Sequence, residues 1–163
     1  MFREMRRKKQ LLPESELTDI VNQATCAVVG VIGDEGYPYT FPISHAFDEE
    51  SNKLYFHSAV SGHKIDAIKN NPKASFCVVG KDDVVSAEYS TYFKSVVGFG
   101  KAYIVEDKEE RAKGFRLLAE KFCMPDLDRL DEVMKSDAPR AVIVALEIEY
   151  MTGKEAIELT NMR

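Results

Sequence analysis

The segment Ser58–Lys64 combines residue types that hold an anion in proteins. It follows a predicted strand and opens a helix expected to run from about Gly62 to Asn70, with Ser61 as its N-cap. The first N–H groups of a helix are unpaired and attract negative charge, so acidic residues are favoured there and a lysine is not. The residues available to an anion are Ser58, Ser61, Gly62, His63 and Lys64. This pattern is typical of an anion site, and an ordinary surface lysine in the first turn explains it equally well.

A proline inside a predicted strand marks a second candidate for ligand contact. Pro42 interrupts the sequence YTFPISH, which otherwise has the residues of a good strand. Proline cannot donate to a β-ladder, so it is tolerated only at a sheet edge or a bulge, and nearby backbone groups are left free. The groups freed here would be those of Phe41, Ile43 and Ser44. The segment is therefore either part of a polar binding site or an ordinary edge strand.

The next predicted strand, LYFHSA, carries a histidine with two alternative roles. Alternation places Tyr55 and His57 on one face of the strand. The opposite face then holds Leu54, Phe56 and Ser58. Histidine titrates near neutral pH and can move a proton in catalysis. Taken alone, His57 is more often a packed, hydrogen-bonded residue than a ligand.

Other features that could do chemistry have plainer explanations. The sequence GFGKAY lacks the length of a Walker loop and the third glycine of a dinucleotide fingerprint, so Gly98 and Gly100 indicate a bulge or close packing. The histidines show no metal-ligand spacing, and no G-x-S-x-G motif provides a serine nucleophile. The basic run Arg6–Lys9 is more typical of a solvated tail than of an arm that contacts phosphates. No metal site is expected.

Composition limits the class of protein. The chain has 163 residues, 45% of them hydrophobic and 30% charged, which suits one globular domain. Its net charge of −5 gives no attraction to nucleic acid or to an anionic membrane. No apolar run suits a signal peptide or a membrane span. Three widely spaced cysteines, Cys26, Cys77 and Cys123, favour reduced core thiols and therefore a cytoplasmic protein.

The pattern of elements predicts an α+β fold dominated by β. Six strands are expected within residues 25–33, 37–48, 54–59, 74–80, 91–107 and 140–151, with a polar loop between the fourth and the fifth. Pro13 opens a helix whose inward positions are Leu17, Ile20, Val21 and Ala24. Asp107 and Glu110 form a capping box for another helix, with Ala112, Phe115, Leu118, Ala119 and Phe122 inward. An acidic helix follows Pro125. So few helical connections favour a mostly antiparallel barrel with peripheral helices over a doubly wound sheet.

The order of four segments resembles a known family. These segments are YPYTFPISH, LYFHSAVSGHK, SVVGFGKAYIVED and IEYMTGKEA, and together they cover most of the chain. They are similar to the pyridoxamine 5′-phosphate oxidase-like flavin-binding split barrels, and within them to the nitroimidazole-resistance branch, whose opening resembles MRRKKQLLPESE. The resemblance implies a six-stranded antiparallel Greek-key split barrel with peripheral helices. It also implies a homodimer with FMN, or alternatively FAD, at the subunit interface.

The resemblance also implies a role for individual residues. The phosphate would lie on Ser58, Gly62, His63 and Lys64. The isoalloxazine ring would be lined by Thr40, Pro42, Ile43 and Ser44, with His57 and Ala59 alongside and Ser95 approaching from the partner chain. The better-known oxidases place adjacent arginine and lysine at the phosphate, where this chain has His63 and Lys64. An arginine-rich C-terminal substrate segment is also missing, so pyridoxamine phosphate is not the expected substrate.

The function implied is a flavin-dependent oxidoreductase. It would reduce small nitroaromatic or quinone-like acceptors, with NAD(P)H as a candidate electron donor and His57 as the residue that orients the acceptor or supplies a proton. Two alternatives stay open. One is a non-catalytic flavin-binding or redox-sensing module, and the other is a haem- or deazaflavin-binding split barrel.

Overall fold

The computed structural model describes residues 1–137 and 140–163. Its strands are β1 (Ala27–Ile32), β2 (Pro38–Ile43), β3 (Ala46–Asp48), β4 (Lys53–Ala59), β5 (Lys73–Val85), β6 (Ser90–Ile104) and β7 (Ala141–Glu155). Its α-helices are α1 (Glu14–Gln23), α2 (His63–Asn70), α3 (Lys108–Phe122), α4 (Leu130–Asp137) and α5 (Ile157–Met162). Short 3-10 helices are η1 (Lys8–Gln10), η2 (Asp34–Gly36), η3 (Ser86–Glu88) and η4 (Met124–Arg129).

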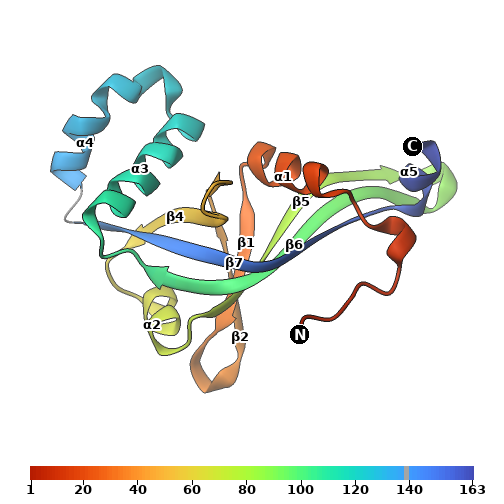
Figure 1. Cartoon of the computed structure of the whole chain (residues 1–163), viewed down its shortest axis with the longest axis horizontal. Coiled ribbons are helices and arrows are strands. Elements are labelled where there is room, and N and C mark those ends of the chain that lie inside the picture. Colours follow the sequence, from red (N-terminus) through yellow and green to blue (C-terminus); the bar gives the residue numbers. More distant parts are fainter. Residues whose placement is uncertain (138–139) are drawn as a thin grey trace.

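The strands form one antiparallel sheet in the order β2-β1-β5-β6-β7-β4-β3. The long strands β5, β6 and β7 extend together away from α2, α3 and α4, toward the end of the molecule that carries α5 (Figure 1). The sheet curls strongly. Four strands separate β2 from β4 in the sheet order, yet the ring centroids of Phe41 on β2 and Phe56 on β4 lie only 6.2 Å apart. Its concave side, called the inner face below, encloses the main core.

Helices cover the two faces of the sheet differently. The inner face packs Phe41, Leu54 and Phe56 against apolar residues of α1 and α2. The opposite side, called the outer face, carries a smaller cluster in which Tyr55 and Ile143 pack against α3. Figure 1 shows α3 and α4 on one side of β4 and β7, and α2 on the other side. The predicted alternation of LYFHSA is confirmed, since Leu54 and Phe56 face inward and Tyr55 faces outward.

The α+β class is confirmed, but seven strands form one open antiparallel sheet, in place of the predicted six-stranded split barrel. The segment 37–48 forms two strands, because the chain turns at Ser44 and His45 between β2 and β3. His45 is fully buried at this turn, where its Nε2 lies 2.8 Å from the carbonyl oxygen of Val21 on α1. Among the described residues the sheet ends on β2 and β3, so it is a curled open sheet. Pro42 accordingly lies on an edge strand, as its chemistry predicted.

The segment between residues 80 and 91 is also not a loop. It continues β5 and β6 as a long hairpin whose turn is η3. Further along β6 the register shifts between Phe99 and Gly100, which confirms the predicted bulge. A side chain at Gly98 would clash with the Phe76 ring, and one at Gly100 would clash with the backbone of Glu147, so close packing is confirmed as well.

Several side chains predicted to be buried are exposed. Cys26 and Cys123 are exposed and Cys77 is half-buried, so the cysteines are free thiols as expected but not core residues. Ala112 and Phe122 on α3 are exposed, because this helix covers the sheet with a narrower stripe that includes Gly114, Leu118 and Ala119. Strand β1 alternates between buried and exposed positions, since only its inner face meets the core. Within the described residues, no helix is both long and apolar enough to cross a membrane.

Candidate functional site

The connection between β4 and α2 is open to solvent and shaped for close approach. β4 ends at Ala59 and α2 begins at His63, so the N-cap is Gly62 and the prediction of Ser61 as N-cap is wrong. Gly62 has a φ of 123°, a conformation that favours glycine, and apart from its chain neighbours no described residue places an atom within 4 Å of the position a Cβ would take. Among the described residues no side chain caps the helix start, which leaves its first N–H groups available to a ligand.

Lys64 projects from this helix start over two buried aromatic rings. Its Nζ lies 4.4 Å from the ring centroid of Phe41 and 5.9 Å from that of Phe56. Burial lowers the pKa of the Lys64 ammonium. Among the described residues no carboxylate forms an ion pair with Lys64. A partly desolvated cation without an acidic partner therefore lies beside the open N-terminus of α2.

The His63 side chain is engaged with the turn between β1 and β2. Its ring stacks on Tyr39 at a centroid distance of 4.1 Å and an interplanar angle of 14°. The backbone N–H of Asp34 donates to His63 Nε2 at 3.4 Å, and the Asp34 carboxylate lies 3.6 Å from the same nitrogen. The imidazole thus holds the turn against the helix start, and what His63 offers a ligand there is its backbone N–H.

A pocket of about 440 Å³ lies on the outer face, between the sheet and the helices α3 and α4. It is called the α3/α4 pocket below. Its walls are Ser44, His57, Phe115, Leu118, Ala119, Phe122, Cys123, Leu130, Val133, Met134 and Ala141. Ser44 and His57 are the predicted site residues that it contains. His57 pairs with Ile143 across β4 and β7, two residues before β4 ends, so the pocket adjoins the β4–α2 connection.

The wall formed by α3 is held in place by a polar cluster. Asp107 caps α3 by accepting from the N–H of Glu110 at 2.8 Å, as predicted. The side chain of Glu110 instead reaches the sheet, where one oxygen accepts from Lys53, Tyr55 and Tyr103 at 2.7, 2.9 and 2.8 Å. Burial and the hydrogen bond to Glu110 raise the pKa of Tyr55 to about 12. Burial opposes ionisation of Glu110, but its three donors outweigh that effect and lower its pKa.

The part of the outer face that α3 does not cover carries a row of exposed apolar side chains. Val28, Ile32, Val79 and Phe99 are 43%, 42%, 59% and 39% exposed. They form the outer patch together with neighbours that the register places beside them, which are Thr40, Pro42, Ser75, Cys77 and Val97. Ser95 lies opposite Val79 at the border of this patch.

The predicted site residues thus fall into separate groups. Ser58, Gly62, His63 and Lys64 lie together at the start of α2, and Ser44 and His57 meet in the α3/α4 pocket. Thr40 and Pro42 are exposed on β2, Ala59 is exposed at the end of β4, and Ser95 borders the outer patch. The side chain of Ile43 faces the core and is buried, so only its backbone could meet a ligand. The wall of α4 was missed, although the helical spacing of Leu130, Val133 and Met134 was a usable signal.

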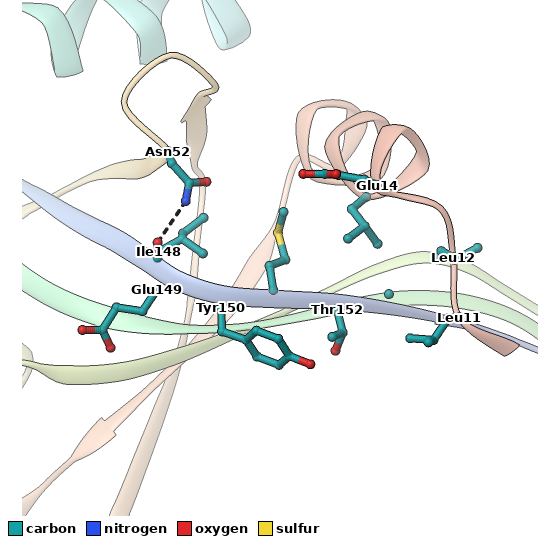
Figure 2. Close-up of a pocket in the computed structure, with 11 residues that line it drawn as sticks. Leu11, Leu12, Glu14, Asn52, Ile148, Glu149, Tyr150 and Thr152 are labelled. Atoms are coloured by element: carbon teal, nitrogen blue, oxygen red, sulfur yellow. Dashed lines mark hydrogen bonds between the residues drawn. The ribbon is translucent and has the colours of Figure 1, made fainter. Parts of the chain in front are cut away.

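A second cleft, of about 430 Å³, runs along β7 beside α1 (Figure 2). There the amide of Asn52 donates to the carbonyl oxygen of Ile148 at 2.9 Å. The charged side chains that line this cleft are Glu14 and Glu149, which would repel a phosphate. None of the predicted site residues lies in it. Within residues 1–137 and 140–163, no group of three or more histidine, cysteine and acidic side chains is placed to hold a metal ion.

The chain is similar to one known protein family. A family model described as "Pyridoxamine 5'-phosphate oxidase" matches residues 13–155. No protein of curated function is significantly similar to the chain. Solved structures share the fold of this chain at low sequence identity, and three of them follow.

The first of these is a candidate 5-nitroimidazole antibiotic resistance protein from Bacteroides thetaiotaomicron, with 21% identity, a TM-score of 0.71 and coverage of 89% of this chain and 86% of that one. The flavocytochrome Anf3 from Azotobacter vinelandii has 18% identity, a TM-score of 0.78 and coverage of 94% and 72%. The FAD and heme binding protein from Mycobacterium smegmatis has 22% identity, a TM-score of 0.72 and coverage of 91% and 73%.

Proposed function

Because the chain belongs to the pyridoxamine 5′-phosphate oxidase family, we propose that it binds FMN and acts as a flavin-dependent oxidoreductase on small nitroaromatic or quinone-like acceptors. The observation that carries this proposal is the start of α2. There an open glycine N-cap, uncapped N–H groups and Lys64 meet without any acidic partner for Lys64 among the described residues. Two structural neighbours named as flavin proteins support the choice of ligand.

The start of α2 fits the phosphate end of FMN. The helix dipole and the first N–H groups stabilise an anion, and Gly62 leaves room for one. Ser58 is half-buried and Ser61 is exposed, so both hydroxyls can donate to phosphate oxygens. Lys64 supplies a full charge, and it would exchange its contact with Phe41 for a charge-assisted hydrogen bond. FAD carries a phosphate at the same point and is the alternative flavin.

The ring end of FMN fits the outer face near the end of β4. Thr40 and Pro42 present exposed surface on the edge strand β2, and the backbone of Ile43 leads to Ser44 at the border of the α3/α4 pocket. His57 and Ala59 lie at the end of β4, between this surface and α2. These residues would hold the isoalloxazine ring between the phosphate site and the α3/α4 pocket.

Bound FMN would supply the electron transfer, and the protein would position the reactants. Overall, NAD(P)H and one proton would reduce a quinone to a hydroquinone, and NAD(P)H would be oxidised to NAD(P)⁺. His57 is the candidate for the residue that orients the acceptor or donates a proton to its oxygen, because it combines exposure with a place in the α3/α4 pocket. A second role for the chain, as a flavin-binding redox sensor, would use the same cofactor contacts without turnover.

The outer patch supports a homodimer with the flavin at the interface. Four exposed large apolar side chains on neighbouring strands form the kind of surface that partner subunits cover. A twofold arrangement would place the partner's copy of the outer patch against Thr40 and Pro42. Ser95 borders the patch, so it is the residue that would reach the flavin of the other subunit.

A haem site is the second candidate, and a specific observation favours it. His57 offers an exposed imidazole inside an apolar pocket, which is the environment of a haem ligand, and two neighbours are named as a flavocytochrome and a heme binding protein. The absorption spectrum of the purified protein separates the cofactors. Flavin, haem and deazaflavin each have a characteristic absorption spectrum, so the spectrum identifies which of them is bound. Flavin bands and flavin-dependent oxidation of NAD(P)H by a quinone would support the proposal, and a haem spectrum would overturn it.

A further inference from the structure

The basic run before α1 is exposed, as a solvated segment would be, but it is anchored on both sides. On one side the Gln10 side chain is buried, and its amide donates to the backbone carbonyl oxygen of Glu155 at 2.8 Å. On the other side the Phe2 ring stacks on Tyr150, with a centroid distance of 5.0 Å and an interplanar angle of 6°. Figure 1 shows this segment in red, near α5 at the end of the long strands. The basic side chains between the two anchors are therefore held at one place on the molecule.

A concave pocket of about 540 Å³ opens between this segment and α5, and it is called the basic pocket below. Its walls are Arg6, Arg7, Lys8, Lys9, Gln10 and Ile157. Four of these six residues are cations and none is acidic. The whole chain has a net charge of −5, so the pocket has the opposite sign to the molecule that carries it. A concave surface lined by charges of one sign concentrates its field on a bound counter-ion.

Most of these cations have no acidic partner. Lys8 pairs with Glu4 at 2.7 Å, but both side chains are exposed, and such pairs contribute little to stability. Arg7 donates to the uncharged side chain of Gln10 at 3.3 Å. Arg6 and Lys9 make neither a hydrogen bond nor an ion pair with any described residue. Three positive charges thus line the pocket without a carboxylate from the described part of the chain.

The acidic groups next to Ile157 in the sequence are engaged elsewhere. Glu155 is fully buried and pairs with Arg163. Glu158 accepts a hydrogen bond from Ser90 at 2.9 Å. Neither glutamate lines the basic pocket. An anion in the pocket would therefore meet cations and not carboxylates.

The number and kind of cations suit an anion that carries several charges on a short chain. A guanidinium can donate to two phosphate oxygens at once, and an ammonium supplies a compact charge. A single phosphate group could satisfy only part of this set. The cations are gathered around one pocket whose volume lies within the range of small-molecule sites. Nucleic acids are usually met by a basic patch or stripe that extends over a whole face.

We propose that the basic pocket binds a small polyphosphate, either free or carried by a nucleotide. None of its wall residues belongs to the start of α2, the α3/α4 pocket or the outer patch. Polyphosphate binding is therefore independent of the proposed flavin function. FMN, which has one phosphate, is not the expected ligand of this pocket.

Calorimetric titration of the purified protein with sodium tripolyphosphate tests the proposal. The double variant Arg6→Gln/Lys9→Gln removes two cations that make no contact with the described part of the chain, so its fold should be unaffected. Lys69→Gln/Lys108→Gln is the matched control, because it removes two exposed cations elsewhere and changes the net charge equally. Tripolyphosphate should bind the parent and the control alike, and the Arg6→Gln/Lys9→Gln variant at least about tenfold more weakly. Equal affinity for the two double variants, or no binding to the parent, would overturn the proposal.

Further ligands in the same titration identify the source of the polyphosphate. Orthophosphate should bind at least about tenfold more weakly than tripolyphosphate, and added salt should weaken both. ATP binding more tightly than tripolyphosphate would support a nucleotide as the ligand, and equal affinity would support the free polyphosphate. Tighter binding of a short DNA duplex or of phosphatidylglycerol vesicles would overturn the assignment to a small molecule.

A variant at the start of α2 separates this site from the proposed flavin site. Lys64→Met should bind tripolyphosphate as tightly as the parent, and Arg6→Gln/Lys9→Gln should bind FMN as tightly as the parent. Loss of tripolyphosphate binding in Lys64→Met would place the polyphosphate at α2 and overturn the proposal. A protein that binds tripolyphosphate but not FMN would refute the proposed function and leave the basic pocket assigned.

Discussion

Replacing Lys64 by methionine separates a phosphate-binding lysine from a packing residue. Methionine keeps an unbranched apolar side chain over Phe41 and Phe56 and removes the charge. If Lys64 contacts the phosphate of FMN, the variant loses a charge-assisted hydrogen bond worth about 1.5–3 kcal/mol, or about ten- to 150-fold in affinity. Titration of FMN fluorescence measures this loss. Lys69→Met, at the exposed far end of the same helix, is the matched control and should bind FMN normally.

The stability of the flavin-free protein should hardly change in the same variant. Removing the ammonium forfeits a cation–π contact worth about 0.5–1 kcal/mol. It also removes a cation from a helix N-terminus, which relieves about 0.3–1 kcal/mol. The two effects offset each other to within about 0.7 kcal/mol. Riboflavin, which lacks the phosphate, should bind the parent and Lys64→Met with equal affinity. Unchanged FMN affinity in Lys64→Met would refute the phosphate role.

Three further predictions concern stability and assembly. Burial, with a smaller contribution from Lys121, lowers the pKa of His45 from 6.5 to about 4. Between these two pH values the unfolded state binds a proton that the folded state does not, so the free energy of unfolding decreases by up to about 3 kcal/mol as the pH falls from 6.5 to 4. In urea denaturations at a series of pH values, His45→Gln should lack this decrease in the free energy of unfolding. A pH profile equal to that of the parent protein would contradict the prediction. Glu110→Ala should lower the free energy of unfolding by about 2–4 kcal/mol, because it leaves three donors without an acceptor, whereas the exposed neighbour Glu109→Ala should change it by less than about 0.5 kcal/mol. Val79→Asp in the outer patch should convert dimers to monomers in sedimentation, whereas Val84→Asp, toward the hairpin end of the same strand, should not; monomers in the parent would refute the dimer.

Features set by local chemistry could be predicted from the sequence. Pro42 implied a sheet edge because it lacks a donor, and β2 is an edge strand. Asp107 implied a helix start because its carboxylate can accept from the first turn, and it does so. The pair Gly98 and Gly100 implied close packing, which a Phe76 ring and a passing strand explain. In each case the chemistry of the residue itself predicts its place in the structure.

Features decided by distant contacts could not be predicted. The seventh strand follows a turn at which His45 is buried against α1, and the local sequence pattern does not indicate that contact. Glu110 fitted a capping box, but its side chain binds two tyrosines and a lysine of the sheet instead. Ser61 fitted an N-cap, but the chain uses Gly62 in a conformation that favours glycine. The α3/α4 pocket combines Ser44 and His57 with helices that lie far from them in the sequence.

We propose that the start of α2 and the outer face of the sheet bind FMN. Titration of FMN into the purified protein, followed by quenching of flavin fluorescence, tests this most directly. We expect saturable quenching with one FMN bound per chain, and a higher affinity for FMN than for riboflavin. Flavin fluorescence that stays unquenched at any protein concentration, or riboflavin binding as tightly as FMN, would contradict it.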